Sequence, residues 1–143
     1  MKQLRLFVVA AIVILASLSA SAQGRGYKIV VNTSNPVTSI SREELSHIFL
    51  RKSLKFSDGR SASPVDLQAN SSVREVFSKD IHHKAASAVD AYWQQQIFSG
   101  KDIPPPQKSE KLALDFVRSN GNGISYVSAG ASTEGLKVLT IVD

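Results

Sequence analysis

The pattern of apolar and polar positions predicts strands and helices that follow one another along the chain. The run YKIVVN (27–32) is aliphatic and β-branched and stops at a polar turn, as buried strands do. Ser41 and Glu44 then show the S-x-x-E spacing of a capping box, and Leu45 and Phe49 share one face at helical spacing. We therefore expect a strand over 27–32 and a helix that begins after Ser41.

A second strand and a second helix are expected after a turn-rich loop (56–63). The segment PVDL (64–67) has the composition of a short strand that begins at a proline. Ser72 and Glu75 repeat the S-x-x-E spacing, which predicts that Ser72 caps the next helix. The apolar stripe expected on this helix consists of Val73, Val76 and Phe77.

The second half of the chain predicts two helices, over 85–100 and 109–119, and two final strands, over 124–128 and 136–142. Between the helices, three prolines in the segment 101–107 exclude helical structure. The residues expected to face inward are Ala85, Val89, Trp93 and Ile97 in the first helix and Leu112, Ala113 and Phe116 in the second. Strands that alternate with helices predict an α/β domain whose sheet is largely covered.

The first residues have the features of a secretory signal peptide. Lys2 and Arg5 precede an apolar run, and the segment ASA (20–22) has the small-x-small form that signal peptidase cleaves. The apolar run is shorter than the roughly 20 residues that a membrane-spanning helix needs. We therefore expect a signal peptide over 1–22 and one mature domain over 23–143, which is periplasmic, soluble and not inserted in the membrane.

The charge and the residue composition exclude several further classes of function. The whole sequence has 17 Lys and Arg residues and 12 Asp and Glu residues, which gives a formal net charge of +5. Without Lys2 and Arg5, 15 basic residues remain against the same 12 acidic ones, and the net charge is +3. No cluster of Lys and Arg is interleaved with aromatic residues, so a nucleic-acid partner is not expected. Cysteine is absent, so the chain has no disulfide, no thiol nucleophile and no cysteine for a lipid anchor.

The segment ANSSVREVF (69–77) is the candidate ligand site. A polar, hydroxyl-rich turn leads into a helix there, and free N–H groups and the helix dipole both favour an anion at such a start. The residues that would hold it are Asn70, Ser71, Ser72 and Arg74. The alternative is structural: Ser72 and Glu75 cap the helix reciprocally and occupy some of those donors, and Glu75 repels an anion.

The sequence evidence for a metal site, a ligand-stacking residue or a catalytic site is weaker. His82 and His83, with Asp80, suggest a metal site, but adjacent residues on a helix point to different faces, so a solvated helix end is expected instead. Trp93 has the spacing of a core residue rather than of a ligand-stacking one. No Ser-His-Asp order in a nucleophile-elbow context and no recognisable frame of paired carboxylates is present. The chain is therefore expected to be neither a metal protein nor an enzyme, and to need no cofactor.

Several segments together resemble one family. These are VVNTSNPVTSISREELSHIFLRK, PVDLQANSSVREVF, AYWQQQIFSG and GNGISYVSAG, and in this order they resemble the substrate-binding proteins of phosphate ABC transporters. The resemblance is to the second half of such proteins and to their short, single-lobe relatives, and it covers Lys28 to Val142. It implies a single three-layer α/β lobe of the periplasmic-binding-protein type, with a mixed sheet flanked by helices.

The binding motif departs from the family pattern. Family members carry a stretch like R-x-x-D-G-S-G-T, which matches the segment from Asp66 to Val73. Ser71 keeps the family serine, but Asn70 and Ser72 stand in place of the glycines, and no arginine lies at the strand end. The first lobe of the two-lobed family members has no counterpart in the chain.

Two functions from different classes follow. The first is an exported solute-binding protein, linked to ABC-type phosphate uptake, that recognises phosphate or a related oxyanion at Ser71 and Ser72. The second is an interaction module that has lost its ligand and docks on a membrane or envelope protein, or on a second copy. The surface expected to meet the partner combines Thr33–Val37 with Asn70–Arg74.

Overall fold

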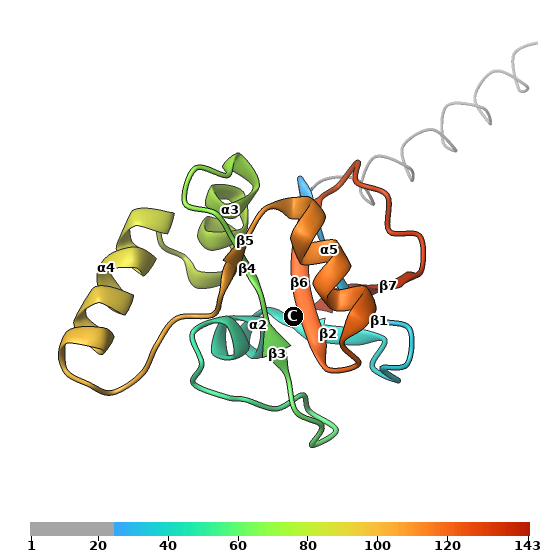
Figure 1. The fold of residues 1–143 in the computed structure, drawn as a ribbon, viewed down its shortest axis with the longest axis horizontal. Coiled ribbons are helices and arrows are strands. Elements are labelled where there is room, and N and C mark those ends of the chain that lie inside the picture. The colour runs from blue at the N-terminus through green and yellow to red at the C-terminus, as the bar shows by residue number, and fades with distance from the viewer. Residues whose placement is uncertain (1–24) are drawn as a thin grey trace, which may run out of the picture.

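The computed structural model describes residues 25–143 (Figure 1). The proposed signal peptide over 1–22 lies outside the described residues. In chain order the elements are β1 (Tyr27–Asn32), β2 (Ser39–Ser41), α2 (Arg42–Phe49), β3 (Ser63–Pro64), β4 (Asp66–Leu67), α3 (Ser72–Phe77), the π-helical η1 (Ser78–His82), α4 (Ala86–Phe98), β5 (Gln107–Lys108), α5 (Glu110–Ser119), β6 (Gly123–Ser128) and β7 (Leu136–Val142).

The main sheet has five strands in the order β2-β7-β1-β6-β3, and β4 pairs with β5 in a small second sheet. The central strand β1 runs antiparallel to β6 and to β7. The edge strands β2 and β3 are parallel to β7 and β6, so β1 alone runs in the opposite direction. The sheet is therefore mixed, as expected.

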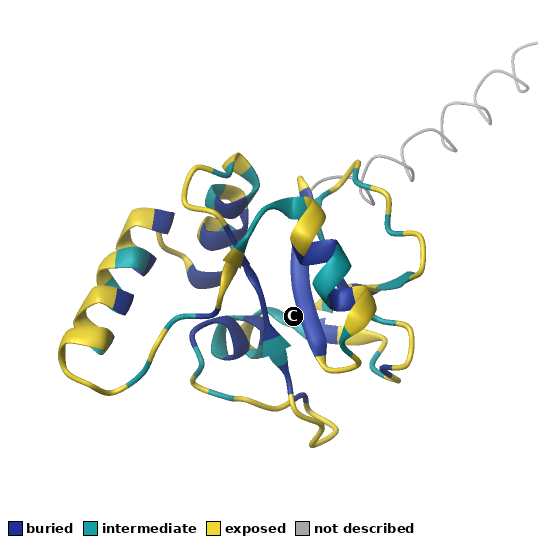
Figure 2. Ribbon diagram, in the orientation of Figure 1, coloured by how far each residue is buried: buried dark blue, intermediate teal, exposed yellow. Residues whose placement is uncertain are grey.

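Helices cover both faces of this sheet, which makes three layers. Ile29 and Val31 of β1 pack into the larger core, with α2, α3 and η1. Val30 points to the other face and packs with Leu114 and Val117 of α5. Because both faces are covered, β1 is apolar at successive positions rather than at alternate ones, and Figure 2 shows the sheet interior as buried.

Helix α4 lies at the edge of the molecule (Figure 1). Only one side of it is buried, where Val89 and Trp93 pack against Leu50 at the end of α2. Trp93 is thus a core residue, as predicted. After the helix, Gly100 has φ +68 and donates its N–H to the carbonyl of Ile97 at 3.0 Å, which is the geometry of a glycine C-cap.

Three predictions about the elements are wrong. The segment 64–67 is not one strand, because Val65 separates β3, which pairs with β6, from β4, which pairs with β5. Ile97 and Leu112 do not face inward, since they are 53% and 52% exposed. The helix that follows 85 begins at Ala86, and Ala85 is its N-cap residue.

The start of α2 follows the prediction in part. Ser41 is the N-cap, and its Oγ accepts from the N–H of Glu44 at 3.0 Å. The reciprocal bond of a capping box is not formed, because Glu44 Oε1 accepts instead from the N–H of Ser57 at 2.8 Å. Glu44 therefore fixes the 56–63 loop to α2. Among residues 25–143, no helix is long and apolar enough to span a membrane.

Candidate functional site

The helix starts share one edge of the sheet. Because β1 alone is reversed, β2, β3, β6 and β7 all end on the same side. Helix α2 follows β2 directly, α3 follows β4, and α5 follows β5, which is parallel to β4. The three helices thus begin at this side, which we term the carboxyl edge, and Ser41, Ser71 and Ser109 are their N-caps.

Ligands of open α/β sheets bind outside the carboxyl ends of the strands, so a binding site is expected at the carboxyl edge.

The two segments of the predicted partner surface do not lie on one face. Thr33–Val37 follows β1 and therefore lies at the opposite edge, where Ser34 approaches Gly121 ahead of β6. Asn70–Arg74 lies at the carboxyl edge, so the prediction that these two segments form one face is wrong.

The cap of α3 is Ser71, not Ser72. Ser71 Oγ accepts from the N–H of Arg74 at 3.2 Å, and Ser72 is the first helical residue. Glu75 does not return to the helix start, because its Oε2 accepts from the N–H of Ala86 at 3.0 Å. The predicted capping box between Ser72 and Glu75 is therefore wrong, because the cap lies one residue earlier and the reciprocal bond of Glu75 is not formed.

Because Ser71 caps the helix, the hydroxyl of Ser72 is not used in the cap. Asn70 and Ser72 are exposed and Ser71 is half-buried. Arg74 and Glu75 donate their N–H groups to Ser71, whereas the N–H groups of Ser72 and Val73 have no acceptor within the described part of the chain. The backbone stays helical through η1 to His82, so the dipole behind these donors is longer than α3 alone.

Arg74 is not a ligand-binding residue, in contrast to the prediction. Its side chain is 2% exposed. Its two terminal nitrogens donate to the two carboxylate oxygens of Asp90 on α4, at 2.7 and 3.3 Å, and its Nε lies 3.6 Å from Asp66. The guanidinium is turned into the protein and cannot reach an anion at the helix start.

Asp66 is buried behind α3 and completes this cluster. Its carboxylate accepts from the N–H of Leu67 at 2.9 Å and from the hydroxyl of Tyr126. Burial raises the pKa of Asp66, and it also raises the pKa of Tyr126, whose hydroxyl faces the carboxylate. The guanidinium of Arg74 thus lies between two carboxylates and is not free for a ligand at the start of α3.

Each helix start at the carboxyl edge also carries a glutamate in its first turn. These residues are Glu43 and Glu44 in α2, Glu75 in α3 and Glu110 in α5. Glu110 is engaged, because its carboxylate accepts from the N–H of Ser128 at the end of β6. The protein's own carboxylates therefore use part of the anion-favouring potential of these helices.

The histidine pair is not a solvated helix end, because His82 is 9% exposed. Its Nδ1 lies 2.8 Å from Ser46 Oγ, and its ring packs edge-on against Phe77. Burial, aided by the positive charges of Lys84 and Arg74, lowers the pKa of His82 to about 4, so the ring is neutral at pH 7. His83 is exposed.

Asp80 takes no part in a metal site with these histidines. Burial alone would raise its pKa, but hydrogen bonds from Tyr27 and Arg42 outweigh that effect and lower it. Residues 25–143 contain no group of three or more His, Cys, Asp and Glu side chains placed to hold a metal ion.

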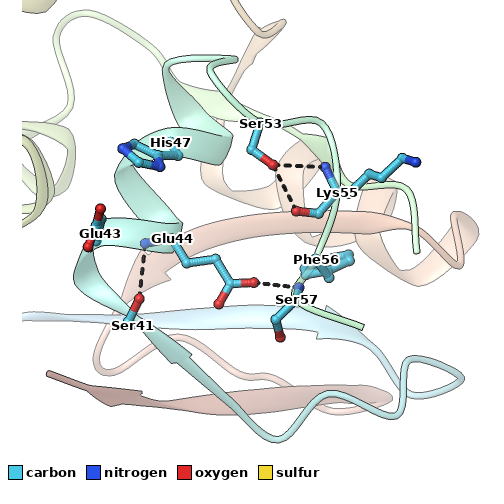
Figure 3. A pocket seen from close by; sticks show the side chains of 8 residues that line it. All are labelled: Ser41, Glu43, Glu44, His47, Ser53, Lys55, Phe56 and Ser57. Atoms are coloured by element: carbon cyan, nitrogen blue, oxygen red, sulfur yellow. Dashed lines mark hydrogen bonds between the residues drawn. The ribbon is translucent and has the colours of Figure 1, made fainter. Parts of the chain in front are cut away.

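The hollows near α2 do not extend to the start of α3. One of about 370 Å³ is shown in Figure 3, and some of its polar groups bond to one another, as Glu44 does to Ser57 and Ser53 does to Lys55. A second, of about 450 Å³, is lined by His47, His82 and His83. Asn70, Ser71 and Ser72 line neither hollow, and of these three residues Asn70 and Ser72 are exposed.

Comparison with known proteins points to one fold. No protein-family model and no curated protein matches the chain. A solved structure of an ABC-type phosphate transport receptor from Vibrio cholerae matches with a TM-score of 0.63 and 20% identity, over 82% of this chain and 47% of that one. The chain has the same fold.

Two further solved structures match the chain over a similar share of its length. A putative phosphate ABC transporter substrate-binding protein with bound phosphate from Clostridium perfringens gives a TM-score of 0.62 at 15% identity, over 81% of this chain and 44% of that one. A possible phosphate binding protein from Planctomyces limnophilus gives 0.61 at 15% identity, over 82% and 42%. The chain thus spans less than half the length of each, and the three-layer α/β lobe expected from the family resemblance is confirmed at the level of the fold.

Proposed function

We propose that the chain is an exported solute-binding-type lobe that contacts a small oxyanion of the phosphate class on one side, at the start of α3. The observation that carries this is the pair of free donors at that position. The N–H groups of Ser72 and Val73 and the exposed hydroxyl of Ser72 lie together at the carboxyl edge. The shared fold supports the proposal, because two of the matched structures are named for phosphate binding and a third for phosphate transport.

The oxyanion is held by neutral donors only. Arg74 contributes nothing, because its charge is neutralised by Asp90 and Asp66. A one-sided, open site leaves the anion in contact with water, which screens and competes for each hydrogen bond. The dissociation constant for phosphate is therefore expected to be on the order of millimolar. Tighter binding requires a second surface.

Thermal melts with two variants of Ser72 test this proposal. Ser72→Ala removes the hydroxyl and keeps the amide, whereas Ser72→Pro removes both donors. Proline suits the first helical position, and Ser71 before it has the extended backbone (φ −74, ψ 123) that a following proline requires. Both variants are expected to fold, so they separate ligand loss from unfolding.

Phosphate at about 20 mM is expected to stabilise the wild type by about 1 to 2 kcal/mol through mass action. The gain is expected to be smaller in Ser72→Ala and absent in Ser72→Pro. A gain of equal size in all three proteins would place the bound phosphate elsewhere and refute the proposal.

A second candidate is a module that docks on an envelope partner without a ligand. The glutamates at the helix starts and the sequestered Arg74 favour it, because both weaken anion binding at the carboxyl edge. Absence of any stabilisation of the wild type by phosphate would select this candidate.

The location of the protein is part of the proposal. We infer export and cleavage after Ala22, from the signal-peptide pattern of the sequence. The intact mass of the mature protein is expected to correspond to a chain that starts at Gln23. A mass that includes residues 1–22 would contradict export by cleavage.

A further inference from the structure

A third hollow, of about 390 Å³, lies beside the edge strand β3. Its apolar lining residues are Leu54, Ala62, Pro64, Pro106 and Phe116. Arg51 and two serines, Ser61 and Ser63, complete the lining. A mainly apolar wall with a few polar groups, at this volume, is typical of small-molecule sites.

The walls of this hollow are fixed by the backbone. Pro64 belongs to β3 and is paired with Ile124 of β6. The carbonyl of Pro106 accepts from the N–H of Asp66 at 2.9 Å, and the carbonyl of Leu54 accepts from the N–H of Ala62 at 2.8 Å. The lining segments are thus held in place by the fold, and the hollow is formed before any ligand enters.

Arg51 is the one charged residue of this lining within residues 25–143. Its Nε is buried and has no hydrogen-bond acceptor in the described part of the chain. Asp102 Oδ1 lies 3.6 Å from this Nε, which is too far for a hydrogen bond, and it accepts instead from the N–H of Ile103 at 2.8 Å. A buried donor without an acceptor is costly, so an acceptor that a ligand brings is favoured there.

The backbone of Arg51 supports a role for its side chain. Arg51 has φ 55, in the left-handed region, and its N–H donates to the carbonyl of Ile48 at 3.1 Å directly after α2. Glycine adopts this conformation freely, whereas a residue with a side chain is strained in it. Such strain gathers at ligand-binding positions.

We propose that this hollow binds a small carboxylic acid with an apolar ring. The carboxylate bonds to the guanidinium of Arg51, whose planar donors match the two oxygens of a carboxylate. The ring lies against Leu54, Pro106 and Phe116. Leu54 is 50% exposed, so the ligand removes apolar surface from water.

Inorganic phosphate fits this hollow less well. Its several charged oxygens would face apolar walls that offer no donors, and burying them there is costly. A carboxylate concentrates its charge at one end, where Arg51 lies. The hollow is also separate from the start of α3, because Ser71 and Ser72 do not line it. The proposal therefore does not depend on the oxyanion site.

Titration of the purified protein with benzoate, followed by amide NMR, tests this proposal. The signals of Ala62 and Phe116 are expected to shift and to saturate with a dissociation constant on the order of millimolar. Those of Ser72 and Val73 are expected to stay unchanged. Acetate lacks the ring and benzyl alcohol lacks the charge, so both are expected to bind at least roughly tenfold more weakly than benzoate.

Three variants assign the carboxylate contact. Arg51→Gln is expected to weaken benzoate binding at least roughly tenfold, because the charged donor is lost. Arg60→Gln, at an exposed arginine outside the hollow, is the matched control and is expected to bind like the wild type. Asp102→Asn keeps an acceptor for Ile103 but removes the competing charge, and it is expected to tighten binding about threefold.

The Asp102→Asn variant keeps the test decisive if Arg51→Gln fails to fold, which the amide spectrum shows. No shift of Ala62 and Phe116 at about 20 mM benzoate would overturn the proposal. So would benzyl alcohol that binds as tightly as benzoate, a folded Arg51→Gln variant that binds like the wild type, or Asp102→Asn that does not bind more tightly. Benzoate shifts at Ser72 and Val73 alone would place the ligand at the start of α3 and overturn it as well.

Discussion

The guanidinium of Arg74 connects three elements behind the start of α3. It joins α3 itself to Asp90 of α4 and to Asp66 of β4, and it is nearly fully buried. A buried charge that loses its partner is destabilising, because its desolvation is no longer offset. Arg74 is thus a structural residue that anchors α4 to the lobe.

Asp90→Asn is expected to lower the free energy of unfolding by about 2 kcal/mol, less than a fully buried pair would lose, because Asp90 is partly exposed to solvent. Urea denaturation measures this change. Asp115→Asn, which breaks only the surface pairs with Lys111 and Arg118, is the control, with an expected change below about 0.5 kcal/mol. Equal, small changes in both variants would mean that Arg74 does not anchor α4.

His82 makes stability depend on pH. Its pKa is about 4 in the folded protein and 6.5 in the unfolded chain, so the unfolded state binds the proton first as the pH falls. Above pH 6.5 the full stability is present, and it is lost progressively between pH 6.5 and 4, by up to about 3 kcal/mol.

Urea midpoints measured from pH 8 to 5 test this prediction. The midpoint of the wild type is expected to fall below pH 6.5, and that of His82→Gln is expected to fall much less. His83→Gln is the control, because His83 is exposed, and it is expected to follow the wild type. A parallel fall in all three proteins would assign the pH dependence to other groups.

At the scale of the elements, the amphipathic segments were predictable and the boundaries were less so. Strand β1 and the start of α2 follow from local patterns, and the structure confirms both. The cap of α3 is misplaced because Ser71 and Ser72 are adjacent and equally able to cap, and only tertiary contacts decide. Glu75 supplies such a contact, because it bonds to Ala86 beyond the next turn.

The errors in the predicted site residues have the same physical cause, which is tertiary contact. Arg74 and Asp90 are far apart in the sequence, with no local pattern that links them, so the burial of Arg74 could not be predicted. Likewise, Tyr126 reaches Asp66 across the sheet. Leu112 and Ile97 have apolar side chains at helical spacing, but each is about half exposed in the part of the chain that the structure describes.

The corrected cap gives a prediction for α3. Ser71→Ala is expected to lower the stability by about 1 kcal/mol, because it removes the acceptor of the Arg74 N–H. Ser72→Ala removes no bond within the described chain and is expected to change stability by less than about 0.5 kcal/mol. Chemical denaturation of the two variants, side by side, tests the assignment. A larger loss of stability in Ser72→Ala than in Ser71→Ala would show that Ser72 is the N-cap.

At the scale of the whole molecule, the chain has the fold of less than half of a phosphate-binding protein. The carboxyl edge carries three serine-capped helix starts, at Ser41, Ser71 and Ser109. The fold class was predictable because strands and helices alternate and several motifs keep their order. The strength of anion binding was not, since it depends on where Arg74 and the glutamates point.

Phosphate titration followed by amide NMR, on protein shown to be monomeric by sedimentation, tests the central claim most directly. We expect the amide signals of Ser72 and Val73 to shift and to saturate with a dissociation constant on the order of millimolar. The same titration of Ser72→Pro is expected to leave Val73 unshifted. No shift of Ser72 and Val73 at about 20 mM phosphate would contradict an oxyanion site at the start of α3, and micromolar binding by the monomer would contradict the claim that the site is one-sided.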